Sequence, residues 1–456
     1  MVKKFNVLNE ELNSKYPSKL FDFKDTSELE PLDSVIGQRR AVEAIDFGLN
    51  MKGLGYNIFV TGLGGTGKST IVRKILEEHA KKDQTSVDLC LVNNFDDEYC
   101  PVVIEMPSGT AVYFSRSMAR FVEVIKDKIP EFFKTPSFKE EQQTLQEEYT
   151  IRQKEKFNEV EKRALEQDLT IIRVENDYQI SPVLDGKPIS LESYQALDEN
   201  IRQALDEKIN ILEEQLDKTL IEVNTLGEEM NTRLRDLIAD RTEQLISEQI
   251  DPVRYYFRDC EDIQVYLKKV KEDIIDNIAL FLGVEGERGD EDNKIQEMSK
   301  SLVKRYKVNV LVDQRHEQGA PVVFEPNPSF QNLFGKIEKK PVMGSFVTDF
   351  TMVQAGSLLK ANKGYLVINI EPLLMNPLVW ESLKRTLEDS LLRIEDMPDQ
   401  ADYGMPSLKP EPIPLTVKVI LVGGYDSFRA LQRADSKFNK IFKVRADFDY
   451  EAEMTE

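Results

Sequence analysis

The residues best suited to chemistry in this sequence are Gly62 to Thr70, which spell GLGGTGKST. They match G-x-x-x-x-G-K-[ST], a pattern in which glycines let the backbone turn tightly and point successive N–H groups at a phosphate. In such a loop the Lys68 ammonium reaches the β- and γ-phosphates, and the Ser69 hydroxyl ligates Mg²⁺. We therefore predict a site for ATP and Mg²⁺ whose binding residues are Gly62, Gly64, Gly65, Thr66, Gly67, Lys68, Ser69 and Thr70.

A second stretch whose residues could take part in chemistry is Tyr365 to Glu371, YLVINIE. It has the pattern of a Walker B strand. Such a strand normally ends in Asp-Glu, but here Asn369 and Ile370 stand in those positions and Glu371 comes one residue late. Asn369 can accept a hydrogen bond from a Mg²⁺-bound water, yet it brings no negative charge, and hard divalent cations favour carboxylates. On an extended strand Glu371 shares a face with Asn369, so it could supply the missing carboxylate if the strand ends early.

These residues give three site predictions. Glu371 is a candidate catalytic residue, and Ser69 and Asn369 are the candidate metal ligands. Loss of one well-placed general base costs on the order of 10²- to 10⁴-fold in rate, so we expect nucleotide binding with slow hydrolysis. Two further groups complete the site: Ile36 and Gly37, in an I-G-Q element where AAA+ proteins hold the adenine, and Arg445, an arginine-finger candidate for which Lys443 is the competing residue.

The elements that must position these residues are buried strands and helices in alternating order. The stretches 56–61, 87–92, 308–312, 321–325, 365–371 and 417–422 are rich in β-branched and aromatic residues and are predicted strands. Helices are predicted after the glycine loop (71–79), at 115–129 with Pro130 closing it, and at 377–388. A strand followed by a helix, repeated, favours a P-loop α/β fold with a parallel sheet and helices on both faces.

The order breaks between about residues 138 and 282, where long charged helices are expected. From Leu205 to Leu237 apolar residues recur at a mean step of about 3.5, which is typical of a coiled coil. Its predicted partner is the helix from about Phe138 to Leu169, running in the opposite direction. Between them, Asp185-Gly186 in the stretch 178–190 predicts a small β-hairpin at the tip. The arm is either a solvated spacer or a platform for client proteins or neighbouring subunits.

Composition limits the partners. The net charge of −21 disfavours nonspecific binding to nucleic acid, so protein substrates are the more natural partners. No run approaches the roughly 18 apolar residues of a membrane span, and the first residues lack a signal peptide, so we expect no membrane association and a cytoplasmic location. The three cysteines fit neither a disulfide framework nor a zinc pattern. We divide the chain into residues 1–130 (first half of the nucleotide-binding domain), 131–300 (helical insertion) and 301–456 (second half).

Several phrases resemble the AAA+ part of the Lon-related proteases, in the bacterial LonB/LonC-like branch. They are GYNIFVTGLGGTGKST, GAPVVFEPNPSFQNLFGKIE, VTDFTMVQAGSLLKANKGYLVINIEPLLMNPLVWESLKR, LKPEPIPLTVKVILVG and IFKVRADFD. The resemblance implies a hexameric ring in which an ATPase module feeds or gates a serine protease chamber. The family's Ser-Lys dyad belongs to a domain that follows the ATPase and its helical lid; we expect this chain to correspond to the part before both, and we assign no dyad in it.

Two alternatives stay open. The chain could be a structural ring-former whose nucleotide site is vestigial and whose arm gates a chamber. It could also be an SMC-type ATPase, since that family has the same order of Walker A, coiled coil and Walker B. The stretch 350–364, FTMVQAGSLLKANKG, has no signature of the LSGGQ kind, and the arm is short, which disfavours the SMC reading.

Overall fold

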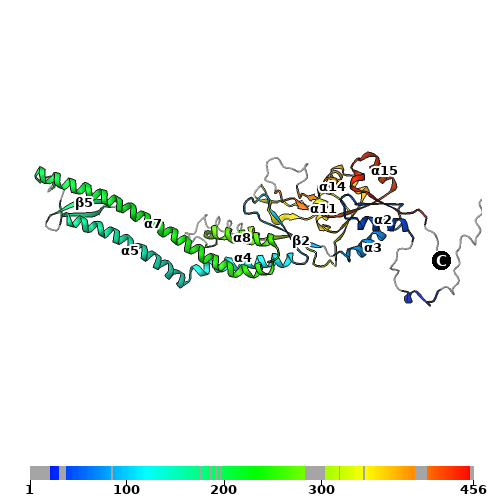
Figure 1. Ribbon diagram of the computed structural model, residues 1–456, viewed down its shortest axis with the longest axis horizontal. Helices are drawn as coiled ribbons and strands as arrows, with labels where there is room; N and C mark the ends of the chain where they lie inside the picture. Colours follow the sequence, from blue (N-terminus) through cyan, green and yellow to red (C-terminus); the bar gives the residue numbers. More distant parts are fainter. Residues whose placement is uncertain are drawn as a thin grey trace, which may run out of the picture.

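The computed structural model describes residues 21–29, 37–83, 86–174, 177–184, 187–189, 194–195, 197–282, 303–317, 319–342, 345–395 and 408–451. Figure 1 shows a body at one end, which holds the glycine loop (residues 62–70), and a long helical arm at the other.

The body is built on a five-stranded sheet with the order β17-β1-β16-β13-β8, in which every neighbouring pair is parallel. The strands are β1 (Ile58–Thr61), β8 (Val322–Glu325), β13 (Tyr365–Asn369), β16 (Lys418–Gly423) and β17 (Val444–Asp447). Val, Ile, Leu and Phe fill them because both faces of such a sheet are covered. The predicted α/β fold with a parallel sheet is confirmed.

Helices cover both faces of this sheet, and alternate strand residues pack on each. On one face, Ile58 and Val60 of β1 meet α2 (Arg39–Asn50) and α3 (Lys68–Ala80). On the other, Phe59 meets α14 (Pro377–Asp389), α15 (Tyr425–Ala434) and α16 (Phe438–Ile441). The centre of the sheet is therefore fixed from both sides, and the carboxyl ends of its strands are held in place.

One predicted strand belongs elsewhere. We expected 87–92 to follow the glycine-loop helix as a strand of the parallel sheet, but β2 (Val87–Val92) pairs antiparallel with β3 (Val102–Pro107) and with β7 (Val308–Val312). That placement was wrong, because a buried apolar run has the same composition in either kind of sheet. In chain order, the parallel sheet continues after α3 only at β8. The division of the chain at residues 130 and 300 stays a prediction.

A helical core lies beside the antiparallel sheet. It is formed by α4 (Ala111–Phe133), the last turns of α7 (Glu199–Tyr256), α8 (Glu261–Asp276) and α9 (Ile278–Leu282). Pro130 does not close α4 as expected but lies inside it. The aromatic rings that follow explain why the helix continues: Phe133 packs edge-on against Phe138 with ring centroids 4.6 Å apart, which holds the last turn.

The arm is an antiparallel pair of helices, α5 (Pro136–Glu166) and α7 (Glu199–Tyr256), and it projects from the body (Figure 1). The predicted apolar face of α7 is confirmed, since Leu212 and Leu216 are buried and the other positions of the pattern are at least partly covered. At the tip, β4 (Leu169–Val174), β5 (Asp177–Leu184) and β6 (Lys187–Pro188) form a small antiparallel sheet. Asp185 and Gly186 lie outside the described residues.

Short elements fill the stretch between β8 and β13. They are α11 (Phe330–Phe334), β9 (Lys336–Ile337), β10 (Lys340–Val342), β11 (Ser345–Val347), η3 (Phe350–Met352), β12 (Val353–Gln354) and α12 (Ser357–Lys360). The remaining ones are η2 (Thr26–Glu28), α13 (Ile370–Leu374), β14 (Leu391–Leu392) and β15 (Ile413–Pro414). In the described part of the chain, no helix combines the length and the apolar character that crossing a membrane requires.

Candidate functional site

The glycine loop connects β1 to α3 at the carboxyl edge of the parallel sheet. Gly65 and Gly67 have φ values of 83° and 77°, a left-handed conformation that glycine adopts without strain, and Gly67 is the N-cap of α3. At Gly62 a Cβ atom would lie 2.8 Å from Cβ of Phe448, so the residue that follows β17 packs directly against the loop. The first N–H groups of α3 have no partner within the helix and are free to bind an anion.

The loop forms one wall of a pocket of about 570 Å³, a size within the range of small-molecule sites. The ends of β13 and β16 form the other wall. The lining residues are Gly62, Gly64, Gly65, Thr66, Gly67, Lys68, Ser69, Thr70, Asn369, Glu371, Val422, Gly423 and Gly424. All eight predicted loop residues and both residues predicted on the partner strand therefore meet in one cavity.

Lys68 is the cation of this pocket. Its Nζ donates to the backbone carbonyls of Gly62 (2.7 Å) and Leu63 (2.6 Å) within its own loop. Burial lowers the pKa of Lys68, and the negative charge of Glu371 partly opposes that shift. An amine desolvated in this way gains more from a phosphate than one in water, since charges interact more strongly where water is excluded.

The partner strand ends earlier than the sequence indicated. Asn369 is the last residue of β13, is exposed, and is also the N-cap of α13. Glu371 lies in the first turn of this helix and not on an extended strand, so the strand ends early, which is the condition under which Glu371 could supply the carboxylate. Pro372 is the physical reason, because proline donates no backbone hydrogen bond to a strand but fits the first turn of a helix. Glu371 still reaches the pocket, from the helix rather than from the strand.

The Glu371 carboxylate is held from β16 and α15. Its Oε1 accepts hydrogen bonds from the Gly424 N–H (3.1 Å) and from the Ser427 hydroxyl (3.3 Å). Sequence reasoning missed Gly423, Gly424 and Ser427. The Gly-Gly pair directly after a predicted buried strand was the available signal, since glycine at a strand end often marks a close approach of another element.

The predicted adenine element is described only in part. Ile36 lies outside the described residues. Gly37 has φ 74° and precedes Gln38, whose side-chain amide exchanges two hydrogen bonds with the backbone of Asp449 (2.7 and 3.1 Å). Gly37 does not line the pocket, but the Gln38 contact places this element beside the segment that follows β17, next to Phe448 and the first glycine of the loop.

Arg445 lies on the edge strand β17 and does not line the pocket. Its Nε bonds Asp447 Oδ1 at 2.7 Å, and its guanidinium lies over the rings of Tyr425 (5.0 Å) and Phe428 (4.5 Å) of α15. The competing residue, Lys443, donates to the Leu54 carbonyl at 2.9 Å. Both cations are engaged within this chain, and the arginine-finger role stays a prediction.

The residues present fit a nucleotide with a hydrated cation better than they fit a cation alone. In the described residues, no group of three or more His, Cys, Asp and Glu side chains gathers to hold a metal ion. Ser69 and Asn369 face the same pocket and offer neutral oxygens. A divalent cation there would take further oxygens from phosphate and water, as Mg²⁺ does at nucleotide sites.

Two family matches fall on different parts of this architecture. The LonB-like AAA domain matches residues 318–449, from just before β8 to just after β17. The Lon-like LonC helical domain matches residues 88–121, which lie in β2, β3 and α4. These two matches support a Lon-related AAA+ protein. An AAA domain of the Lon family implies nucleotide binding and suggests ATPase activity.

Other comparisons add little to this assignment. A crystal structure of NtrX from Brucella abortus is similar at 12% identity and a TM-score of 0.20, over 42% of this chain and 44% of that one. The chain thus spans less than half of that structure. None of the curated proteins compared with the chain matches it.

Proposed function

We propose that this chain is the ATP-binding AAA+ module of a Lon-like ATP-dependent protease, which delivers or gates protein substrates for a serine protease chamber. The observation that carries the proposal is the single pocket in which Lys68 and the start of α3 face Asn369 and Glu371. The Lon-related family matches support the link to proteolysis.

In this proposal each group has a defined task. The glycine N–H groups and the amino end of α3 bind the phosphates, and Lys68 neutralises their charge. Ser69 and Asn369 would hold hydrated Mg²⁺, which would supply positive charge against the charge that develops on the phosphate oxygens. Glu371 is the general base for the attacking water.

Hydrolysis is expected to be slow. The neutral Asn369 stands where a carboxylate would hold Mg²⁺, and Glu371 approaches from the first turn of α13 instead of the strand. Nucleotide binding therefore depends on the glycine loop and α3, whereas hydrolysis depends on β13 and α13. The rate of hydrolysis is expected to be low because β13 ends in Asn369 instead of a carboxylate.

We further propose that the chain assembles as a homo-hexameric ring in the cytoplasm and acts on proteins, with no nucleic acid or membrane partner. The family supports the ring, and the net charge of −21 supports the choice of protein over nucleic acid. Arg445 would then act across a subunit boundary, after release from Asp447.

The binding claim is tested by calorimetry with ATP and Mg²⁺ on the purified chain. Lys68→Ala should abolish measurable binding, because it removes the pocket's cation. Lys52→Ala is the matched control: Lys52 is an exposed lysine that does not line the pocket, so its loss should leave ATP affinity unchanged. Equal ATP affinity for the wild type and Lys68→Ala would contradict the proposal.

One observation favours the alternative of a structural ring-former with a vestigial site. Asn369 leaves the metal position without a charge, so the pocket could bind no nucleotide while the ring still assembles. Absence of heat on titration with millimolar ATP, together with intact hexamers by light scattering, would select this alternative.

A further inference from the structure

The two hydrogen bonds to Glu371 converge on one oxygen. Gly424 N–H and Ser427 Oγ both donate to Oε1, at 3.1 and 3.3 Å. Oε2 forms no hydrogen bond with any residue that the structure describes. A carboxylate held by one oxygen in this way keeps a fixed rotamer, and its second oxygen remains able to accept a proton.

The close approach that makes these contacts depends on Gly423. A Cβ atom at this position would lie 2.3 Å from Cγ2 of Ile370 and 3.1 Å from Oε1 of Glu371. The end of β16 therefore packs against α13 with no room for a side chain. This packing brings the Gly424 N–H to the carboxylate.

Ser427 is carried by a helix that is anchored along its length. Phe428 packs against Phe59 of β1 and Phe438 of α16, with ring centroids 5.3 and 5.6 Å apart. At the far end, the C-cap residue Asp435 accepts hydrogen bonds from the Trp380 indole (2.9 Å) and the Lys384 ammonium (2.6 Å). The hydroxyl is thus presented by a rigid element, as a precise positioning group requires.

We propose that Ser427, together with the Gly424 N–H, is the positioning group for Glu371 and fixes Oε1 so that Oε2 is the oxygen that receives the proton. This inference rests on the proposed function. In the step concerned, the water oxygen bonds to the γ-phosphorus, the bond from that phosphorus to the β–γ bridging oxygen breaks, and ADP leaves with the electron pair. The proton of the water passes to Oε2 and then to solvent.

The first test separates a positioning role from a structural one by steady-state ATPase kinetics. Ser427→Ala should lower kcat about tenfold, the lower end of what loss of an orienting hydrogen bond costs, while KM stays unchanged. Ser427→Thr keeps a hydroxyl and should restore most of kcat. Asp426→Ala, an exposed change in the same helical turn, is the matched control and should leave kcat unchanged.

The second test needs no nucleotide. Glu371→Ala removes the acceptor of the Gly424 N–H, so hydrogen exchange of the segment 424–428 should accelerate, whereas Glu371→Gln keeps an acceptor oxygen and should preserve protection. Trp380 is the chain's only tryptophan and lies at the other end of α15, so its unchanged emission would show that the helix remains docked.

The outcomes distinguish the two proposals. Calorimetry that detects no ATP binding overturns the proposed function, whatever the exchange data show. Normal binding and turnover that are identical in Ser427→Ala and wild type overturn the positioning role and leave the proposed function standing. Unchanged exchange of segment 424–428 in Glu371→Ala also overturns it.

Discussion

At the level of single residues, the site separates the binding of a nucleotide from its hydrolysis. Lys68 and its glycines follow the P-loop pattern without departure, and the structure places them together in one pocket. Asn369 and Glu371 depart from the pattern expected of a metal ligand followed by a base. The sequence was sufficient to predict Glu371 as a member of the site. It was not sufficient to predict that Glu371 reaches the pocket from the first turn of α13.

Asn369→Asp should restore a charged ligand for Mg²⁺. Asp is also a good N-cap for α13, so the substitution should leave the fold intact. We expect ATP turnover to rise about tenfold, since a single well-placed electrostatic contact is worth that much or more, and half-saturation to occur at lower Mg²⁺. A magnesium titration of the ATPase rate measures both. No gain in rate would show that the metal position lies elsewhere, and Asn369→Ala serves as the uncharged control.

Gly62→Ala should destabilise the fold, whereas Gly64→Ala should not. The new Cβ at Gly62 would lie 2.8 Å from Cβ of Phe448, and overpacking of this kind costs roughly 1–3 kcal/mol. Denaturant unfolding followed by circular dichroism measures the difference. Equal midpoints for both variants would mean that the end of β17 moves freely away from the loop.

At the level of elements, α15 is the piece that connects the pocket to the rest of the body. Its first turn holds Glu371, its middle packs on β1, and its C-cap is fixed by Trp380 and Lys384. Arg445 stacks on Tyr425 and Phe428 of the same helix. Movement of α15 would therefore change the positions of both Glu371, the proposed general base, and Arg445, the arginine-finger candidate.

Asp435 should make this anchorage sensitive to acid. Burial raises the pKa of Asp435, but hydrogen bonds from Lys384 and Trp380 outweigh that effect, so its pKa is lowered from 3.8. The ionised carboxylate stabilises the fold fully above the unfolded pKa, and this contribution is lost as pH falls through the lower folded value. The stability difference between wild type and Asp435→Asn should be largest above about pH 4 and should shrink below it.

Denaturant midpoints between pH 3 and 6 test this dependence. Asp259→Asn is the control, because the Asp259 side chain is 93% exposed and that of Asp435 only 13%. A stability difference for Asp435→Asn that does not vary with pH would contradict the ion pair as the cause.

The errors made from the sequence have local physical causes. Runs such as 417–422 could be assigned to strands because burial on both faces demands apolar residues, and β16 confirms it. The antiparallel pairing of β2 could not be predicted from this apolar composition, because the composition of a buried strand does not depend on the direction of its neighbours. The sequence predicts a helix end at Pro130, yet α4 continues to Phe133, where aromatic packing against Phe138 holds its last turn. Pro372 is the residue from which the end of β13 before Glu371 can be predicted.

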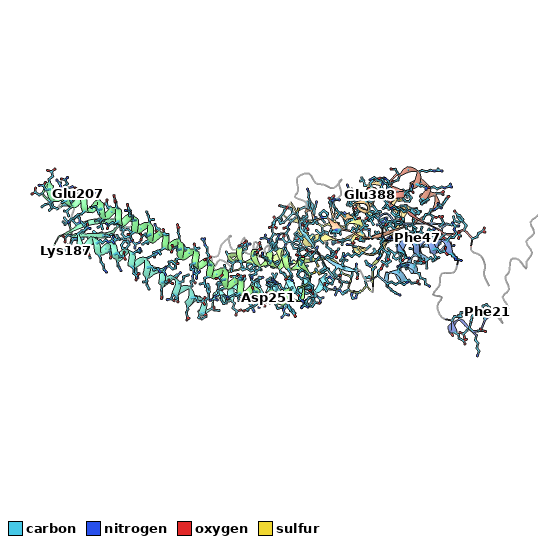
Figure 2. The ribbon with its side chains drawn as sticks, viewed as in Figure 1. Phe21, Phe47, Lys187, Glu207, Asp251 and Glu388 are labelled. Carbon is cyan, nitrogen blue, oxygen red and sulfur yellow. The ribbon has the colours of Figure 1, made fainter. Side chains whose placement is uncertain are left out.

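At the level of the whole molecule, the arm and the nucleotide pocket have separate cores. The tip of the arm is stabilised by its own cluster around Leu212 and Leu216. In Figure 2 the side chains of Glu207 and Lys187 lie at the far end of the arm, whereas those of Phe47 and Glu388 lie in the body. The arm and the pocket therefore share no hydrophobic core among the described residues.

Shortening the arm should therefore leave nucleotide binding unchanged. Tyr149 of α5 and Glu229 of α7 line one cavity, so a short glycine-serine linker can replace residues 150–228. We expect the ATP dissociation constant to stay within about twofold, because distant sites without shared contacts are independent. Calorimetry on the shortened chain measures it. Loss of ATP binding would show that the arm contributes to the pocket.

We expect the P-loop site to hydrolyse ATP slowly, through the displaced carboxylate of Glu371. The most direct measurement is the steady-state ATPase rate of wild type and Glu371→Gln, with ATP binding of both confirmed by calorimetry. We predict slow turnover that falls at least tenfold in Glu371→Gln, while affinity is retained. Brisk turnover that is unaffected by the substitution would contradict this account.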